Sequence, residues 1–132
     1  MAHPFQTVPL PPARDVLAPD GSEIRPLAQT ARGSMVHCLL PPGGVSRAVA
    51  HRTVDELWYC VSGRGEMWRR LGESEEIVVA EPGVSLSIPC GARFQFRATG
   101  DAPLEFVIVT MPPWPGTDEA YFVEGAWARP RS

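Results

Sequence analysis

Residues 43–63 read GGVSRAVAHRTVDELWYCVSG, and residues 83–98 read GVSLSIPCGARFQFRA. Glycine opens both stretches, glycine also closes the first, and the second contains a turn from Pro89 to Gly91. Glycine and proline favour tight turns, and apolar runs of strand length lie between them. The two stretches therefore predict short strands joined by tight turns.

The same alternation of turn residues and apolar runs continues along the chain, which predicts one all-β domain. Its 132 residues are the size of a single domain, and 44% of them are hydrophobic, enough for one core. Turn signals that recur about every ten residues are typical of a sandwich or barrel. They occur at 18–21, 41–44, 62–65, 81–83 and 89–91.

Nine segments have the composition or the alternation of strands. We expect them at Glu23–Leu27, Ser34–Leu40, Val45–Ala50, Glu56–Val61, Gly65–Arg70, Glu76–Ala80, Ser85–Ile88, Arg93–Ala98 and Leu104–Thr110. The last of them contains the run Phe106–Val109, which is apolar on both faces. Such a strand is either central in a sheet or covered from outside, and the partner in a homodimer would supply that cover.

Proline-rich segments flank the expected barrel. Residues 1–30 form an N-terminal arm with four prolines in its first 13 residues and an edge strand after them. Residues 31–111 are the expected barrel, and residues 112–132 are a tail rich in proline and tryptophan that packs on it. Proline lacks the backbone N–H donor, so the tail is not expected to join a central strand. Trp114 then either completes the core at a sheet edge or covers a pocket mouth.

Charge and cysteine content exclude several classes of protein. The net charge is -3 and there is no basic block, so we expect no nucleic acid and no membrane as partner. The three cysteines lack CxxC spacing, which favours small buried hydrophobes over a disulfide framework or a zinc site. No signal peptide or membrane-spanning run is expected, and free thiols suit a cytoplasmic protein.

Together the two stretches resemble the paired motifs of the cupin family, whose frames read G-x5-H-x-H-x4-E-x6-G and G-x5-P-x-G-x2-H-x3-N. The glycines and the proline of both frames are present in order, with nineteen residues between Gly63 and Gly83. The resemblance implies a cupin-type jelly roll, that is, a double-stranded β-helix barrel with a ligand cavity in one end. Val49 and Phe94 replace the first and last histidines of the frames, so the metal-ligand set is incomplete.

His51 and Glu56 occupy the second histidine position and the carboxylate position, which point into the cavity in cupins. The resemblance therefore makes them the candidate catalytic pair, because some metal-free sugar epimerases of this fold use a histidine and a carboxylate. A histidine oriented by a carboxylate can act as a general base or bind a ligand. The pair is also compatible with a structural ion pair retained at the barrel mouth.

The candidate ligand-binding residues follow from the alternation of side chains along the expected strands. An inward Glu56 places further side chains of its strand inward, and aromatic rings from other strands join them. Such a wall suits a small planar or partly apolar ligand, although rings of this size also fill small barrels. The candidates are Trp58, Cys60, Phe94 and Phe96, with Trp68 as an alternative to Phe96.

Two arginines have an undecided direction. Arg93 adjoins the replaced ligand position at Phe94, and a one-residue bulge would turn it into the cavity. Arg69 follows a hairpin whose loop length decides its face, and an inward Arg69 would favour an anionic ligand.

A metal site would need a further ligand. His51 and Glu56 suit Fe, Mn, Ni or Zn, but catalytic zinc sites and facial-triad iron sites use three protein ligands. His37 is the candidate third ligand, because it lies on the strand before the first stretch, in phase with Met35 and Leu39. Its alternative role is that of a structural histidine with one hydrogen-bond partner.

These observations leave three functions open. The favoured one is a protein that binds a small organic molecule in the barrel and acts as an isomerase, epimerase or lyase through His51 and Glu56, with no tightly bound cofactor. The second is a metal-dependent cupin, such as a dioxygenase, with His51, Glu56 and His37 as ligands. The third is a non-catalytic, dimeric binding module.

Overall fold

The computed structural model describes residues 4–116 and 118–129, and the regular elements in this part of the chain are all β-strands. They are β1 (Val16–Leu17), β2 (Glu23–Gln29), β3 (Ser34–Leu40), β4 (Val49–His51), β5 (Asp55–Ser62), β6 (Gly65–Leu71), β7 (Ser74–Ala80), β8 (Ser85–Ile88), β9 (Arg93–Ala98), β10 (Leu104–Met111) and β11 (Ala120–Phe122). Among these residues no helix is long and apolar enough to cross a membrane.

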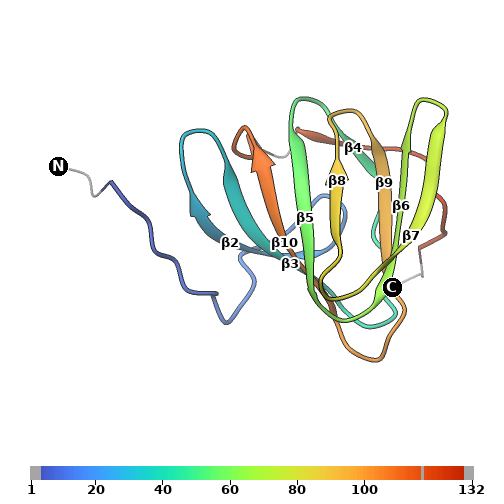
Figure 1. Cartoon of the computed structure of the whole chain (residues 1–132), viewed down its shortest axis with the longest axis horizontal. Coiled ribbons are helices and arrows are strands. Elements are labelled where there is room, and N and C mark those ends of the chain that lie inside the picture. Colours follow the sequence, from blue (N-terminus) through green and yellow to red (C-terminus); the bar gives the residue numbers. More distant parts are fainter. Residues whose placement is uncertain (1–3, 117, 130–132) are drawn as a thin grey trace.

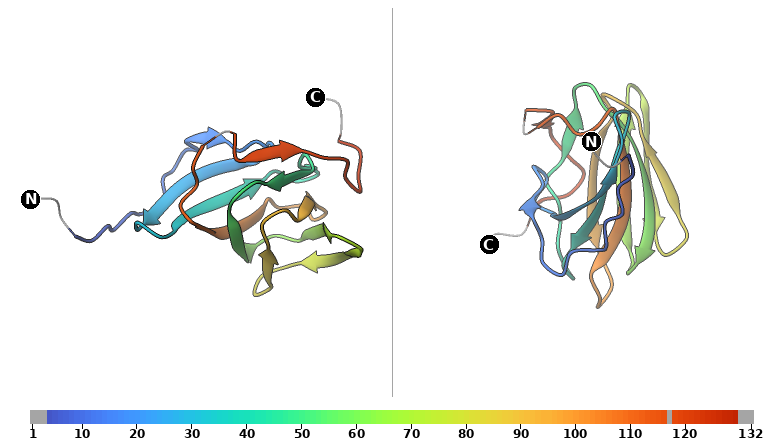
Figure 2. Two further views of the ribbon diagram at one scale, coloured as in Figure 1. Left: turned by 90° about the horizontal axis from the view of Figure 1, so that it is seen from above. Right: turned by 90° about the vertical axis from the view of Figure 1, so that its left-hand side faces the viewer.

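The strands form two antiparallel sheets, which is the cupin-type jelly roll predicted from the sequence (Figure 1). The six-stranded sheet has the order β1-β2-β3-β10-β5-β8, and the five-stranded sheet has the order β11-β4-β9-β6-β7. Strands distant in the chain are therefore neighbours, as β3 and β10 are. Figure 2 shows that the N-terminal segment leads away from the body at the end opposite the C-terminal segment.

The predicted strands are present, with one substantial difference in bounds. The expected strand Val45–Ala50 begins only at Val49, because the preceding backbone bonds to several different segments. Val45 makes an isolated bridge to Arg97, and the N–H of Arg47 donates to the carbonyl of Asp20 at 2.7 Å. The short edge strands β1 and β11 were not predicted.

Alternation along β5 sends every second side chain into the core. Glu56, Trp58 and Cys60 are buried, whereas Leu57 and Tyr59 between them are exposed.

The indole ring of Trp58 contacts Phe96 and Phe106 edge to face, with centroids 5.1 and 5.0 Å apart. Burial of aromatic rings like these stabilises the fold by roughly 1.5–3 kcal/mol each. Strand β10 lies between β3 and β5, so its apolar outer side chains belong to a central strand.

The C-terminal tail extends the five-stranded sheet at its edge. Strand β11 pairs with β4, opposing Ala120 to His51. Farther on, Gln95 and Trp127 exchange two hydrogen bonds, from the Gln95 amide to the Trp127 carbonyl and from the Trp127 N–H back to Gln95. The tail therefore covers both the edge and part of the outer face of this sheet.

The N-terminal arm makes its contacts on β2. The Arg25 side chain donates to the Pro11 carbonyl at 3.1 Å, and the Gln29 N–H donates to the Gln6 side chain at 3.0 Å.

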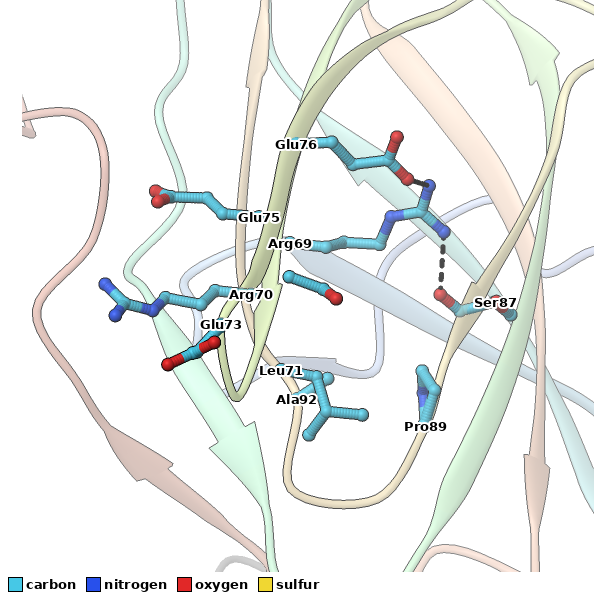
Figure 3. A pocket seen from close by; sticks show the side chains of 10 residues that line it. Arg69, Arg70, Leu71, Glu73, Glu75, Glu76, Ser87, Pro89 and Ala92 are labelled. Atoms are coloured by element: carbon cyan, nitrogen blue, oxygen red, sulfur yellow. Dashed lines mark hydrogen bonds and ion pairs between the residues drawn. The ribbon is translucent and has the colours of Figure 1, made fainter.

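Arg69 joins the two sheets along their open side. Its guanidinium donates to the Ser87 carbonyl on β8 at 2.9 Å and pairs with Glu76 on β7 at 2.7 Å (Figure 3). It lines an open surface hollow of about 500 Å³ that also contains Arg70. Arg69 is in phase with the core residue Met67 and lies opposite Phe94, so it is on the inward face of β6, where it holds the edge strands β7 and β8 together at the open edge between the sheets.

Gly63 closes the turn between β5 and β6 in a conformation that other residues tolerate poorly. Its φ is 83°, and an added Cβ would lie 2.1 Å from the Pro103 carbonyl oxygen. We expect Gly63→Ala to lower the free energy of unfolding in urea by at least about 3 kcal/mol, since backbone strain and a clash add. The control is Gly43→Ala, where φ is 75° and no atom lies within 4 Å. We expect it to cost about 1 kcal/mol, and equal losses would contradict the role of the clash.

Candidate functional site

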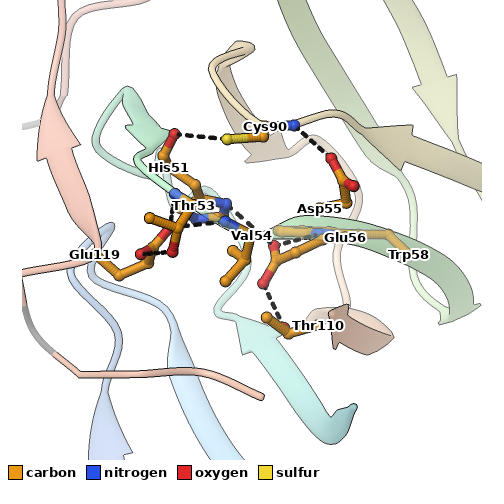
Figure 4. A network of polar contacts seen from close by, with 9 residues as sticks. All are labelled: His51, Thr53, Val54, Asp55, Glu56, Trp58, Cys90, Thr110 and Glu119. Carbon is orange, nitrogen blue, oxygen red and sulfur yellow. Dashed lines mark hydrogen bonds and ion pairs between the residues drawn. The ribbon is translucent and has the colours of Figure 1, made fainter. Parts of the chain in front are cut away.

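Glu56 lies inside the barrel and is held by two hydrogen bonds. The indole N–H of Trp58 donates to Oε1 at 2.9 Å, and the hydroxyl of Thr110 donates to Oε2 at 2.6 Å (Figure 4). Thr110 reaches Glu56 because the β5–β10 register places the two residues opposite each other. The carboxyl group is thus fixed in position by side chains from its own strand and from the adjacent one.

His51 faces Glu56 from the other sheet. It ends β4, and its Nδ1 lies 3.8 Å from Glu56 Oε1, too far for a hydrogen bond. The imidazole is only 4% exposed, and its Nδ1 has no hydrogen-bond partner among the described residues. Phe94 and Trp114 contact the ring edge to face, with centroids 5.2 and 5.3 Å away.

Both side chains line one cavity of about 440 Å³, within the range that small organic ligands occupy. Most of the lining is apolar and comes from β2, β3, β10 and the segment before β2. Its polar side chains include Asp20, Ser22, Ser34, His51, Glu56 and Thr110, and its aromatic rings are Trp58, Phe94 and Trp114.

Burial shifts the two central ionisable groups in opposite directions. It raises the pKa of Glu56 to about 7, although the hydrogen bonds from Thr110 and Trp58 act to lower it. Burial lowers the pKa of His51 to about 4, against the attraction of the Glu119 carboxylate. At neutral pH the imidazole is therefore neutral, and Glu56 is divided between its protonated and ionised forms.

The profile of one protein family, described as Cupin domain, matches residues 36–110, which is more than half of the chain. The chain belongs to the cupin superfamily. None of the curated proteins compared with it matches significantly.

Solved structures similar to this cupin show the same architecture. An uncharacterized conserved protein with a double-stranded β-helix domain from Klebsiella pneumoniae has a TM-score of 0.65 at 18% identity, covering 90% of this chain and 91% of its own. TT1209 from Thermus thermophilus has a TM-score of 0.57 at 26% identity, covering 74% of this chain and 90% of its own. The capsular polysaccharide assembling protein CapF from Staphylococcus aureus has a TM-score of 0.70 at 21% identity, covering 90% of this chain but 33% of CapF.

The structure of this cupin brings together part of the predicted ligand-binding set. Trp58 and Phe94 line the cavity with His51 and Glu56. Cys60 and Phe96 point inward as expected, but both are buried in the core and do not line the cavity.

Arg93 is exposed, because β9 pairs with β6 without a register shift and no bulge turns it inward. Trp68 lies on the opposite side of its strand from Met67, which belongs to the core, and donates to Glu75 at 2.7 Å. Trp68 therefore does not replace Phe96 in the interior.

His37 lies on the opposite face of β3 from the cavity, which corrects its expected place beside His51. Its neighbours Val36 and Cys38 face inward, and the His37 ring bonds to Glu105 at 2.9 Å. The arrangement is that of a structural histidine with one partner.

The residues present do not fit the metal site of the cupin frame. Val49 and Phe94 offer no donor atoms, which leaves His51 and Glu56 as the two remaining ligand positions of the frame, fewer than a catalytic metal site uses. Across residues 4–116 and 118–129, no three histidine, cysteine, aspartate or glutamate side chains are grouped closely enough to bind a metal ion.

Three residues of the cavity were missed as site residues. Asp20 was read only as part of a turn, although it lies buried in the lining. Thr110 became a partner of Glu56 only through the strand register, which the sequence does not reveal. Trp114, expected either in the core or over a pocket mouth, contacts His51 and lines the cavity. Its backbone N–H donates a hydrogen bond to the Ser34 hydroxyl.

Glu119 fixes the loop that follows His51. Its carboxylate accepts hydrogen bonds from the Thr53 N–H and hydroxyl and from the Val54 N–H (Figure 4). Burial acts to raise the pKa of Glu119, but these hydrogen bonds outweigh it and lower the pKa. The tail thus holds the His51 end of the site through an ionised carboxylate.

The opposite pKa shifts predict a pH-dependent difference between wild type and Glu56→Gln. A raised Glu56 pKa makes the free energy of unfolding fall as pH rises from about 4.5 to about 7, whereas a lowered His51 pKa makes it rise from about 4 to about 6.5. Wild type therefore shows partial cancellation. Glu56→Gln lacks the Glu56 contribution. The free energy of unfolding of Glu56→Gln minus that of wild type should therefore be larger at about pH 8 than at about pH 4, by on the order of 3 kcal/mol.

Urea denaturation across this pH range measures the difference, with the exposed Glu73→Gln as control. A difference between wild type and Glu56→Gln that does not change with pH would show that Glu56 titrates normally.

Proposed function

We propose that this cupin binds a small, partly apolar organic molecule in its cavity and moves a proton within that molecule, with Glu56 as the proton carrier and His51 as a hydrogen-bonding group. The reaction class is isomerisation, epimerisation or elimination. One observation carries the proposal: a buried carboxyl group and a buried imidazole nitrogen that has no hydrogen-bond partner among the described residues line the same cavity of about 440 Å³. Ionisable groups with shifted pKa values in an apolar cavity are typical of catalytic sites.

Glu56 has the properties of the proton acceptor. A pKa of about 7 leaves an ionised fraction at neutral pH while making that carboxylate more basic than an exposed one. In its ionised form it removes a proton from a carbon beside a carbonyl group, and the electron pair of the C–H bond moves to form an enolate. When that carbon also carries a hydroxyl group the enolate is an enediolate, and return of the proton from Glu56 to the former carbonyl carbon, with the hydroxyl proton passing to the oxygen on that carbon, isomerises the molecule. Epimerisation requires the planar enolate to turn over in the cavity before Glu56 returns the proton to its other face.

His51 has the properties of a neutral hydrogen-bonding group. With a pKa of about 4 it carries one ring N–H and one lone pair at neutral pH. Its N–H can donate to the enolate oxygen while Glu56 holds the transferred proton. No electron donor or acceptor outside the substrate is needed for this sequence of steps.

Neighbouring residues hold Glu56 and the loop after His51 in position. Thr110 and Trp58 orient Glu56, and the tail holds the loop after His51. The three free cysteines suit a reducing compartment, and we propose a cytoplasmic location. The homodimer expected from the sequence stays a prediction.

The test is a fragment screen by ¹H–¹⁵N NMR, followed by exchange of ligand C–H hydrogens in D₂O. We expect neutral planar fragments to shift the indole signals of Trp58 and Trp114, and ligands with acidic C–H bonds to exchange in wild type. Glu56→Gln should slow this exchange at least about 100-fold, the usual contribution of a general base.

The matched pair Val36→Phe and Val109→Phe separates the cavity from the surface. Val36 lines the cavity, whereas Val109 faces the other side of the adjacent strand β10. Binding should be lost in Val36→Phe and kept in Val109→Phe. Absence of any fragment that binds wild type would overturn the proposed function.

A further inference from the structure

Asp20 brings a second buried carboxyl group to the cavity. It lies in the turn between β1 and β2 and is only 6% exposed. Both of its hydrogen bonds, from the N–H and the hydroxyl of Ser22, fall on Oδ1 at 2.9 and 2.6 Å. Oδ2 accepts no hydrogen bond from the described residues, which leaves one oxygen of a cavity-lining carboxyl group available to a ligand.

The separation between His51 and Glu56 leaves room for a ligand donor. Nδ1 and Oε1 are 3.8 Å apart, and this nitrogen has no partner among the described residues. One ligand nitrogen can lie about 2.9 Å from both atoms at once, because their separation is shorter than the sum of two hydrogen-bond lengths. With the ring proton on Nε2, His51 Nδ1 accepts a hydrogen bond, as Glu56 does.

The remaining lining matches a cation rather than an anion. It contains the acidic side chains Asp15, Asp20 and Glu56, and among the described residues that line it there is no lysine or arginine. Burial raises the pKa of Asp20, although the hydrogen bonds from Ser22 and the charge of Arg129, which does not line the cavity, act to lower it. A cationic group beside Asp20 favours its ionised form. The rings of Trp58 and Trp114 also line it, and aromatic faces attract organic cations.

We propose that the ligand of this cavity is an organic amine, whose ammonium group is recognised by Asp20, Glu56 and His51 and whose apolar body lies against the aromatic wall. This inference rests on the proposed function and adds the chemical class of the ligand. The mostly apolar lining favours an organic cation over a hydrated inorganic one, since a metal ion would need more oxygen or nitrogen ligands than the site provides.

Three probes of similar shape and different charge test this inference on the full chain: 2-phenylethylamine, 2-phenylethanol and phenylacetate. Titration of the Trp58 and Trp114 indole signals gives the dissociation constants. We expect the amine to bind at least about tenfold more tightly than the alcohol, and the alcohol more tightly than the acid, because hydrogen bonds to charged groups are the stronger ones.

Asp20→Asn tests the carboxylate while keeping an oxygen that accepts from Ser22. It should weaken the amine about tenfold and leave the alcohol within about twofold of wild type. Asp101→Asn, in an exposed loop, is the control and should change neither. If Asp20→Asn fails to fold, the order of the three probes in wild type still decides.

Each outcome has a defined meaning. Equal binding of amine and alcohol, or tighter binding of the acid, would overturn the amine inference and leave the proposed function intact. The same conclusion follows if none of the three binds while neutral fragments do. If no fragment of any charge binds, the proposed function fails and the amine inference fails with it.

Discussion

The hydrogen bonds from Trp58 and Thr110 to Glu56 are the interaction on which the site depends. They hold a carboxyl group inside an apolar barrel, where an unpartnered one would be costly to bury. Each partner is set by the fold, since Trp58 shares the inward face of β5 and Thr110 lies opposite Glu56 in the β5–β10 register. The two neutral donors offset the cost of burying the Glu56 carboxyl group, while burial still raises its pKa to about 7.

The replaced ligand positions explain why this cupin has a cavity of a different kind from a metal site. Phe94 turns one ligand position into part of an aromatic wall, and Val49 makes the other apolar. The hollow that remains is lined by residues of both sheets and also by Asp20 and Trp114. What is left of the polar set is a carboxyl group and an imidazole from facing sheets, close but not bonded.

Much of the fold and part of the site could be predicted from the sequence. The glycines of the two motifs adopt positive φ angles, including 75° at Gly43 and 97° at Gly83, so their spacing identified the turns and hence the strands. Period-two alternation placed Glu56 and Trp58 inward. It did not give the inward face of β3, so the sequence left open whether His37 is a metal ligand or a structural histidine, and its bond to Glu105 shows the structural role.

The rest depended on contacts between distant segments, which local patterns do not encode. Thr110 needed the register of β10 against β5, and Asp20 needed the turn before β2 to lie against the cavity. Arg93 needed an unbroken β6–β9 register to stay outside. His51 and Glu56 belong to opposite sheets and meet across the sandwich, an arrangement that depends on how the two sheets pack.

Direct titration of Glu56 and His51 by NMR tests the central claim most closely, using the side-chain ¹³C signal of the carboxyl group and the ¹⁵N signals of the imidazole. Burial of both groups at one cavity predicts midpoints at about 7 for Glu56 and about 4 for His51. Midpoints at the ordinary values of 4.5 and 6.5 would contradict it, because they would mean that both groups are solvated and that the proposed site is not formed.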